Sequence, residues 1–147
     1  MRNSIVLSII FIFSSSVAAE NILLQKEQAK GMLVQCSRDT PEYEGSWQPS
    51  GEEIKDLENN LFKISTLVTK SCCGHGRIEG EIKDYTLQYV GIIIKGDKYI
   101  YINALAGIYP VSMHSPDIIC DGGKSFWGAV YDPVSKTFSR LSFNGQI

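Results

Sequence analysis

Tyr85-Thr-Leu-Gln-Tyr-Val-Gly-Ile-Ile-Ile94 and Tyr99-Ile-Tyr-Ile-Asn-Ala-Leu105 are two runs of β-branched and aromatic residues, separated by a short segment that contains Gly96-Asp97. Such runs on either side of a two-residue Gly-Asp turn predict an antiparallel β-hairpin. With Gly96 and Asp97 as the turn, Lys95 is predicted to lie opposite Lys98. The central part of the fold is therefore expected to be an antiparallel sheet.

Alternation along these two strands assigns each side chain to one of two sheet faces, because the side-chain period of a strand is two. One face is predicted to carry Leu87, Tyr89, Gly91, Ile93, Ile100, Ile102 and Ala104. The other face is predicted to carry Val90, Ile92, Ile94, Tyr99, Tyr101 and Asn103.

A second hairpin is predicted near the C-terminus, with strands over residues 125–131 and 137–143. Asp132-Pro133 opens its turn, because proline fixes φ and an aspartate side chain caps the bend. If the connecting loop has four residues, one face carries Phe126, Gly128, Val130, Leu141 and Phe143, and the other carries Trp127, Ala129, Tyr131, Phe138 and Arg140.

Two helices are predicted before the strands, over residues 21–35 and from about Gly51 to Ile64. The second begins with the capping box Ser50-Gly-Glu-Glu53 and carries apolar residues at helical spacing. We therefore expect an α+β domain in which one or two N-terminal helices pack on an antiparallel β-meander of at least four strands.

Residues 1–19 have the pattern of a secretory signal peptide. Arg2 supplies a positive charge, an apolar run follows, and Val17-Ala18-Ala19 fits the rule for cleavage after small residues. The apolar run has about nine residues, far fewer than the roughly 20 that a membrane-spanning helix needs. We expect cleavage near Ala19, a single disulfide-braced domain over residues 20–147, and a periplasmic or secreted location without a membrane span or lipid anchor.

The composition argues against several classes of partner. The chain of 147 residues has a formal net charge of −2 at pH 7, and no run of basic residues stands out. A nucleic-acid-binding domain usually carries a basic surface, so we expect no nucleic-acid partner.

The four cysteines, Cys36, Cys72, Cys73 and Cys120, predict a disulfide framework in an exported chain. A direct bond between the adjacent Cys72 and Cys73 requires a strained ring. Cys36 and Cys120 are therefore each expected to pair with one of them, and the sequence leaves open which pairs with which. A metal site that adds His75 is disfavoured, because zinc sites prefer cysteines separated by two to four residues. We expect no metal and no cofactor.

The chain contains no motif that identifies a reaction, and we predict no catalytic residue. Gly123-Lys124-Ser125 lacks the glycine five positions earlier that a phosphate-binding loop requires. The candidate binding residues are His75 and Arg77 on the loop after the paired cysteines, His114 with Asp121 near the loop over residues 106–117, and a face of the sheet. That face is predicted to gather Tyr99, Tyr101, Asn103, Trp127, Tyr131 and Arg140, residue types that protein interfaces favour. The alternative is that the N-terminal helix or the long loops cover this face and make it part of the core.

Several short segments resemble a group of small exported proteins of Gram-negative bacteria that has no assigned activity. They are Trp47-Gln-Pro-Ser50, Gln88-Tyr-Val-Gly-Ile-Ile93, Tyr99-Ile-Tyr-Ile-Asn103, Cys120-Asp-Gly-Gly123, Phe126-Trp-Gly128 and Tyr131-Asp-Pro133. The resemblance covers about residues 30–147. It implies an envelope location and this fold, and nothing catalytic.

The leading hypothesis is a non-enzymatic periplasmic or secreted binding protein that engages another envelope or secreted protein. One form is an inhibitor or immunity protein against a cell-wall hydrolase, since a braced loop with His75 and Arg77 could enter a cleft lined by catalytic carboxylates. One alternative is a small enzyme or ligand carrier that uses His114 and Asp121 between the sheet and the 106–117 loop. Another is a structural envelope protein.

Overall fold

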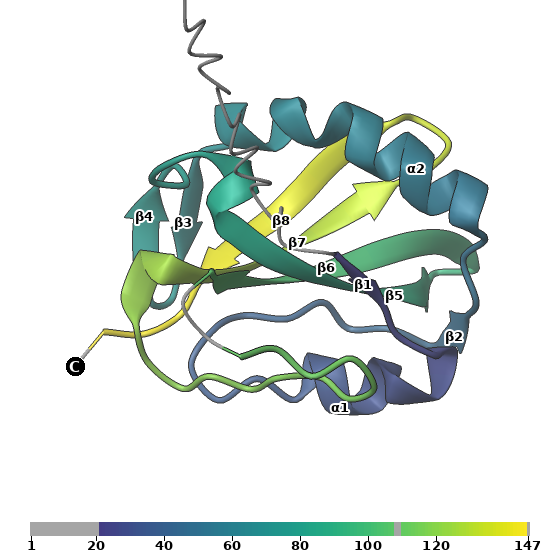
Figure 1. The fold of residues 1–147 in the computed structure, drawn as a ribbon, viewed down its shortest axis with the longest axis horizontal. Helices are drawn as coiled ribbons and strands as arrows, with labels where there is room; N and C mark the ends of the chain where they lie inside the picture. Colours follow the sequence, from purple (N-terminus) through teal and green to yellow (C-terminus); the bar gives the residue numbers. More distant parts are fainter. Residues whose placement is uncertain (1–20, 108–109, 147) are drawn as a thin grey trace, which may run out of the picture.

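A six-stranded sheet forms the centre of the fold (Figure 1). Its strands lie in the order β1-β5-β6-β7-β8, and β2 also pairs with β5. They are β1 (Ile22–Leu23), β2 (Gly45–Trp47), β5 (Tyr85–Ile94), β6 (Asp97–Ala106), β7 (Phe126–Asp132) and β8 (Thr137–Phe143). A separate two-stranded hairpin consists of β3 (Thr69–Ser71) and β4 (Gly74–Gly76). All ladders are antiparallel except that between β1 and β5.

The computed structural model describes residues 21–107 and 110–146. The predicted signal peptide therefore lies outside the described residues. Within them the α+β class and the antiparallel meander of β5 to β8 are confirmed. None of the helices in this part of the chain is long and apolar enough to cross a membrane.

Two α-helices lie on opposite faces of the sheet, α1 (Ala29–Leu33) and α2 (Gly51–Asn60) (Figure 1). Short 3-10 helices flank them and precede two of the long strands: η1 (Lys26–Gln28), η2 (Leu61–Thr66), η3 (Ile82–Asp84) and η4 (Gly123–Ser125). The predicted helix over residues 21–35 is wrong at its start, because residues 22–23 form β1 instead. There the backbone N–H of Leu24 donates to the carbonyl oxygen of Tyr89 over 2.9 Å, so the chain extends along the edge of β5 before it turns.

The capping box of α2 is confirmed. The N–H of Glu53 donates to Ser50 Oγ over 3.3 Å, and the Glu53 carboxylate accepts from the N–H of Ser50 over 2.7 Å. The α-helix ends at Asn60 and continues as η2, so the predicted helix to Ile64 has the right extent but a tighter last part.

The first hairpin turns at Lys95-Gly96 rather than at Gly96-Asp97. Ile94 pairs with Asp97, and both turn residues have positive φ, 52° for Lys95 and 84° for Gly96. These values favour the twist of a two-residue hairpin turn. The predicted pairing is therefore wrong by two residues. The predicted faces are still correct, because a shift of two residues leaves every side chain on its own face.

The second hairpin has the predicted four-residue loop, since Asp132 pairs with Thr137. Beyond it, however, β8 carries a β-bulge. Gly128 pairs with Ser142 and Val130 with Ser139, so β8 has one more residue than β7 over this stretch. An extra residue reverses the alternation. Leu141 and Phe143 consequently lie on the Trp127 face, and the predicted face for them was wrong.

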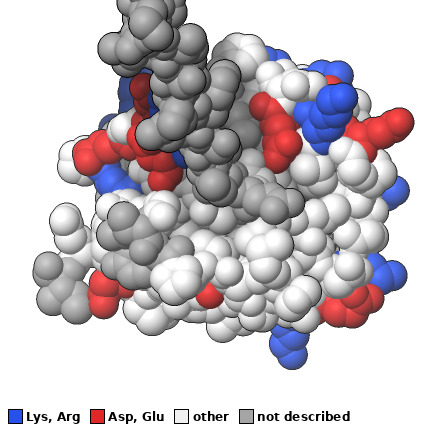
Figure 2. Space-filling view, in the orientation of Figure 1, with Lys and Arg blue, Asp and Glu red and all other residues white. Residues whose placement is uncertain are grey.

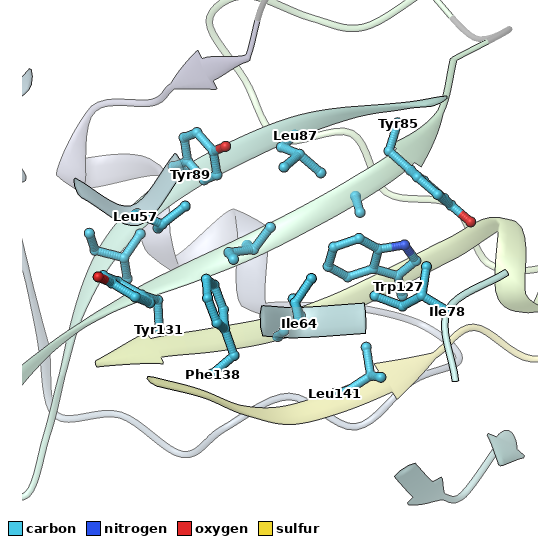
Figure 3. Packing of buried hydrophobic residues seen from close by; sticks show 14 of the residues in the cluster. Leu57, Ile64, Ile78, Tyr85, Leu87, Tyr89, Trp127, Tyr131, Phe138 and Leu141 are labelled. Atoms are coloured by element: carbon cyan, nitrogen blue, oxygen red, sulfur yellow. The ribbon is translucent and has the colours of Figure 1, made fainter. Parts of the chain in front are cut away.

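Each face of the sheet has its own buried cluster. On the α2 side, Leu57 and Ile64 pack against Tyr89, Trp127 and Tyr131 (Figure 3). On the α1 side, the cluster is smaller and comprises Ile22, Leu24, Ala29, Met32, Leu33, Val90, Ile92, Tyr101 and Val130. Both faces of the central strands are therefore core, as expected for strands that are apolar at successive positions.

Candidate functional site

The β3–β4 hairpin is short and firmly attached. Cys72 and Cys73 form its two-residue turn, and Ser71 pairs with Gly74. The hydroxyl of Ser71 donates to the carbonyl oxygen of Gly74 over 3.1 Å, and the N–H of Cys72 donates to the Asp39 carboxylate over 3.1 Å. Gly74 lies against the ring of Phe143, where an added β-carbon would be 3.2 Å from ring and side-chain atoms. The hairpin is thus held against β8.

The disulfide pairing differs from the prediction. Cys36 bonds to Cys120, and Cys72 bonds to its neighbour Cys73. The Cα atoms of Cys36 and Cys120 lie 5.1 Å apart, in the usual range for a disulfide. Tertiary structure brings the segments around residues 36 and 120 together, and no local feature of the sequence reports this contact.

Basic side chains gather on this hairpin. Lys70 and His75 are cross-strand partners and are exposed. Arg77, just after β4, is also exposed, and its Nη1 donates to the carbonyl oxygen of Thr66 over 3.1 Å. The predicted binding residues His75 and Arg77 are therefore both accessible.

A groove adjoins the hairpin. Its first cavity, of about 190 Å³, is lined by residues 39–41, β3 and residues 140–142 of β8. A second cavity, of about 600 Å³, continues along Glu42, Tyr43 and Glu44 to Ile94 and Lys95. The two cavities share Thr40 and Arg140, so they adjoin at these residues, and we refer to the two together as the groove.

Arg140 stands where the two cavities meet. It is the bulge residue of β8 and has a φ of 52°, a conformation that costs a non-glycine residue energy. Residues held in this region are often associated with function. Arg140 is exposed, and its side chain borders the groove instead of joining the predicted aromatic face.

The exposed cations of this region have no acidic partners in the described part of the chain. Three ion pairs occur there, and their cations are Lys83, Lys124 and Lys136. Lys70, Arg77 and Arg140 are in none of them. We call these three residues together with His75 the basic surface. Figure 2, in the orientation of Figure 1, shows charges of both signs around the rim of this face and few across its visible middle.

The predicted aromatic face does not exist. In the β6–β7 ladder Ile100 pairs with Tyr131 and Ala104 with Trp127, so both aromatic residues share the α2 side. Tyr99 and Tyr101 belong to the cluster on the other side. The prediction assigned the faces of each hairpin separately and then matched the wrong face of the second hairpin to the face of the first that carries Tyr99 and Tyr101. Tyr101, Trp127 and Tyr131 are at most 1% exposed, so they cannot contact a partner.

Asn103 belongs to a buried polar network that the sequence analysis missed. Arg38 donates through Nη2 to Asn103 Oδ1 and through Nη1 to Asn144 Oδ1, the latter over 3.2 Å. Asn103 in turn donates to Gln88 Oε1 over 3.0 Å and to the carbonyl oxygen of Asp117 over 2.9 Å. Burial lowers the pKa of Arg38. The network fastens the 112–117 segment to the sheet, and no pattern in the sequence around Arg38 indicates it.

Two further predicted residues, His114 and Asp121, are exposed. Within the described part of the chain, neither lines the groove or either of two further cavities, one beside α2 and one beside α1. The same residues contain no group of three or more His, Cys, Asp or Glu side chains that could hold a metal ion.

Comparison of the chain with protein-family models, curated proteins and solved structures gives no match. The functional assignment therefore rests on the geometry of the basic surface and its groove.

Proposed function

We propose that the protein is a non-enzymatic exported binding protein, periplasmic or secreted, whose basic surface engages an acidic region of another protein. The observation that carries this proposal is the gathering of Lys70, Arg77 and Arg140, exposed and without ion-pair partners in the described chain, on one braced hairpin and its groove. The signal-peptide pattern at residues 1–19 and the disulfides support export.

The attachment of the hairpin favours binding. A loop that is already ordered loses little conformational entropy when a partner binds. Unpaired cations also speed association with an acidic surface and select for it. Arginine is enriched in interfaces because its planar group makes several directed hydrogen bonds to carboxylates.

A concrete form of the proposal is an inhibitor or immunity protein for a cell-wall hydrolase. Glycoside hydrolases use a pair of carboxylates on either side of the bond that they cleave. A two-stranded hairpin with Lys70 and His75 side by side and Arg77 at its base is narrow and basic, and it complements such a cleft in shape and charge.

Inhibition assays test this form directly. Hydrolysis of peptidoglycan by a purified muramidase of the same envelope is measured against increasing amounts of the protein. We expect inhibition that weakens as salt is raised, because exposed charge pairs are screened. His75→Ala and Arg77→Ala should each raise the half-inhibitory concentration by roughly tenfold.

Lys55→Ala provides the matched control. Lys55 is an exposed lysine on α2 that lies outside the basic surface, so its removal should leave inhibition unchanged. Inhibition that is unaffected by both hairpin substitutions, or no inhibition of the hydrolase at all, would exclude this form of the proposal.

A further inference from the structure

The two disulfides have very different consequences for the chain. Cys36 and Cys120 are 84 residues apart, so their bond closes a long loop and should stabilise the fold by about 4–5 kcal/mol in the chain-entropy model. Cys72 and Cys73 are adjacent, so their bond restricts almost nothing in the unfolded chain. Loop closure does not explain why the second bond is present.

The hairpin does not need the Cys72–Cys73 bond to keep its shape. Three interactions hold the hairpin and do not involve the ring that the Cys72–Cys73 bond closes. They are the ladder between β3 and β4, the hydrogen bond from the Ser71 hydroxyl to the Gly74 carbonyl, and the contact of Gly74 with Phe143. The Asp39 carboxylate also holds the backbone N–H of Cys72. Opening the bond should therefore leave the hairpin in place.

The geometry makes this bond the easier one to open. Adjacent Cα atoms are 3.8 Å apart, closer than the 4.4–6.8 Å at which most disulfides form. Strained disulfides are the labile and regulatory ones. Cys72 is exposed and Cys73 is half-buried at the hairpin tip, so an attacking thiolate reaches Cys72. Cys36 and Cys120 are exposed too, so strain rather than access separates the two bonds.

We propose that Cys72–Cys73 is a thiol–disulfide exchange site whose co-reactant is a protein dithiol, and that Cys36–Cys120 is the structural bond. A thiolate of the donor attacks the sulfur of Cys72, forms a mixed disulfide and releases Cys73 as a thiolate, which takes up a proton. The second thiol of the donor then attacks the donor's first sulfur in the mixed disulfide. Cys72 leaves as a thiolate and takes up the second proton. Two electrons and two protons pass to the hairpin, and the donor becomes a disulfide.

The site is independent of the proposed binding function, because it is defined by the chemistry of the hairpin tip alone. In the reduced state it presents two adjacent thiols. Such a pair can bind a trivalent arsenical through two sulfur–arsenic bonds, with loss of water from phenylarsine oxide. This reagent therefore serves as a probe for the reduced site.

Graded reduction followed by alkylation and mass spectrometry tests the proposal. The purified protein is equilibrated with increasing dithiothreitol, alkylated and digested. We expect Cys72 and Cys73 to become alkylated together at a dithiol concentration roughly tenfold or more below that which opens Cys36–Cys120. After the dithiothreitol is removed without oxygen, protein reduced at that lower concentration should also take up one phenylarsine oxide and keep its circular dichroism spectrum.

The double variant Cys72→Ser/Cys73→Ser is the matched control and should show no thiol and no arsenical adduct under the same conditions. The proposal is overturned if Cys36–Cys120 opens at the same or a lower concentration. It is equally overturned if Cys72 and Cys73 are free thiols in the oxidised protein, or are bonded to another chain.

Discussion

The hydroxyl group of Tyr101 lies over the backbone of Gly128, in the space that a β-carbon at residue 128 would fill. Nε of Arg38 lies 3.1 Å from the same position. Tyr101 and Arg38 are both buried, and burial raises the pKa of the Tyr101 hydroxyl. The absence of a side chain at residue 128 therefore allows β7 to accommodate the buried tyrosine and guanidinium.

Gly128→Ala should lower the free energy of unfolding by about 1–3 kcal/mol, because the new methyl group has to displace buried polar atoms from a packed strand. Urea denaturation measures the change. Gly51→Ala is the control, since no atom lies within 4 Å of its added β-carbon, and it should leave stability unchanged or slightly higher. Equal stability of the two variants would show that Tyr101 and Arg38 can move aside freely.

Arg140 should show an unusual preference for glycine. Its φ of 52° is unfavourable for any residue with a β-carbon, so Arg140→Gly should be more stable than Arg140→Ala by about 1 kcal/mol. Ser139 is exposed on the same strand and has no positive φ. There the order should reverse, with alanine the more stable. Thermal denaturation of Arg140→Gly, Arg140→Ala, Ser139→Gly and Ser139→Ala tests the bulge. The same order of stability at both positions would argue against a bulge at Arg140.

The two disulfides should differ in their effect on stability. Cys36→Ala/Cys120→Ala should lower the free energy of unfolding by about 4–5 kcal/mol, because the loop that it frees is long. Cys72→Ser/Cys73→Ser should change it by less than about 1 kcal/mol. Urea denaturation under oxidising conditions gives both values. A large loss in the second variant would mean that the hairpin depends on its internal bond.

Asp56 should make the protein sensitive to acid. The hydrogen bond from Lys136 over 2.7 Å, and after it that from the Tyr131 hydroxyl over 2.8 Å, hold the pKa of this carboxyl below its ordinary value of 3.8. The ionised form is favoured in the folded state, so its contribution is present above pH 3.8 and is lost as the pH falls through the lowered pKa.

Asp56→Asn should accordingly be less stable than the natural chain at neutral pH and should lose less stability below about pH 4. The midpoints of urea denaturation at neutral pH and below about pH 4 measure this difference in stability. Glu52→Gln is the control on the same helix, since Glu52 makes no ion pair within the described residues. If the asparagine variant and the natural chain gave parallel pH profiles, Asp56 would not be the source of acid sensitivity.

Local patterns in the sequence predicted the parts of the fold that local chemistry controls. The Ser50–Glu53 capping box specifies where α2 begins, because both partners lie within one helical turn. The faces of β5 and β6 follow from alternation, which survives a register error of two residues. His75 and Arg77 were identified as accessible because they lie in a glycine-rich segment beside the paired cysteines.

Non-local contacts decided what the sequence analysis missed. The bulge at Arg140 reverses the alternation of β8, and no residue pattern nearby indicates it. The register between β6 and β7 puts Trp127 and Tyr131 on the opposite face of the sheet from Tyr101, so the predicted aromatic face does not form. Arg140 lies in the groove, which is formed by segments about 100 residues apart in the chain.

The sequence alone determined the fold class, the capped helix, the meander and the basic character of the segment after the cysteines, because these depend on side-chain periodicity and on neighbours a few residues away. Tertiary structure alone decided the disulfide pairing, the buried network around Arg38 and the groove beside Arg140. Each of these brings together residues that are far apart in the chain, and their contact is set by the free energy of packing the whole core rather than by any local preference.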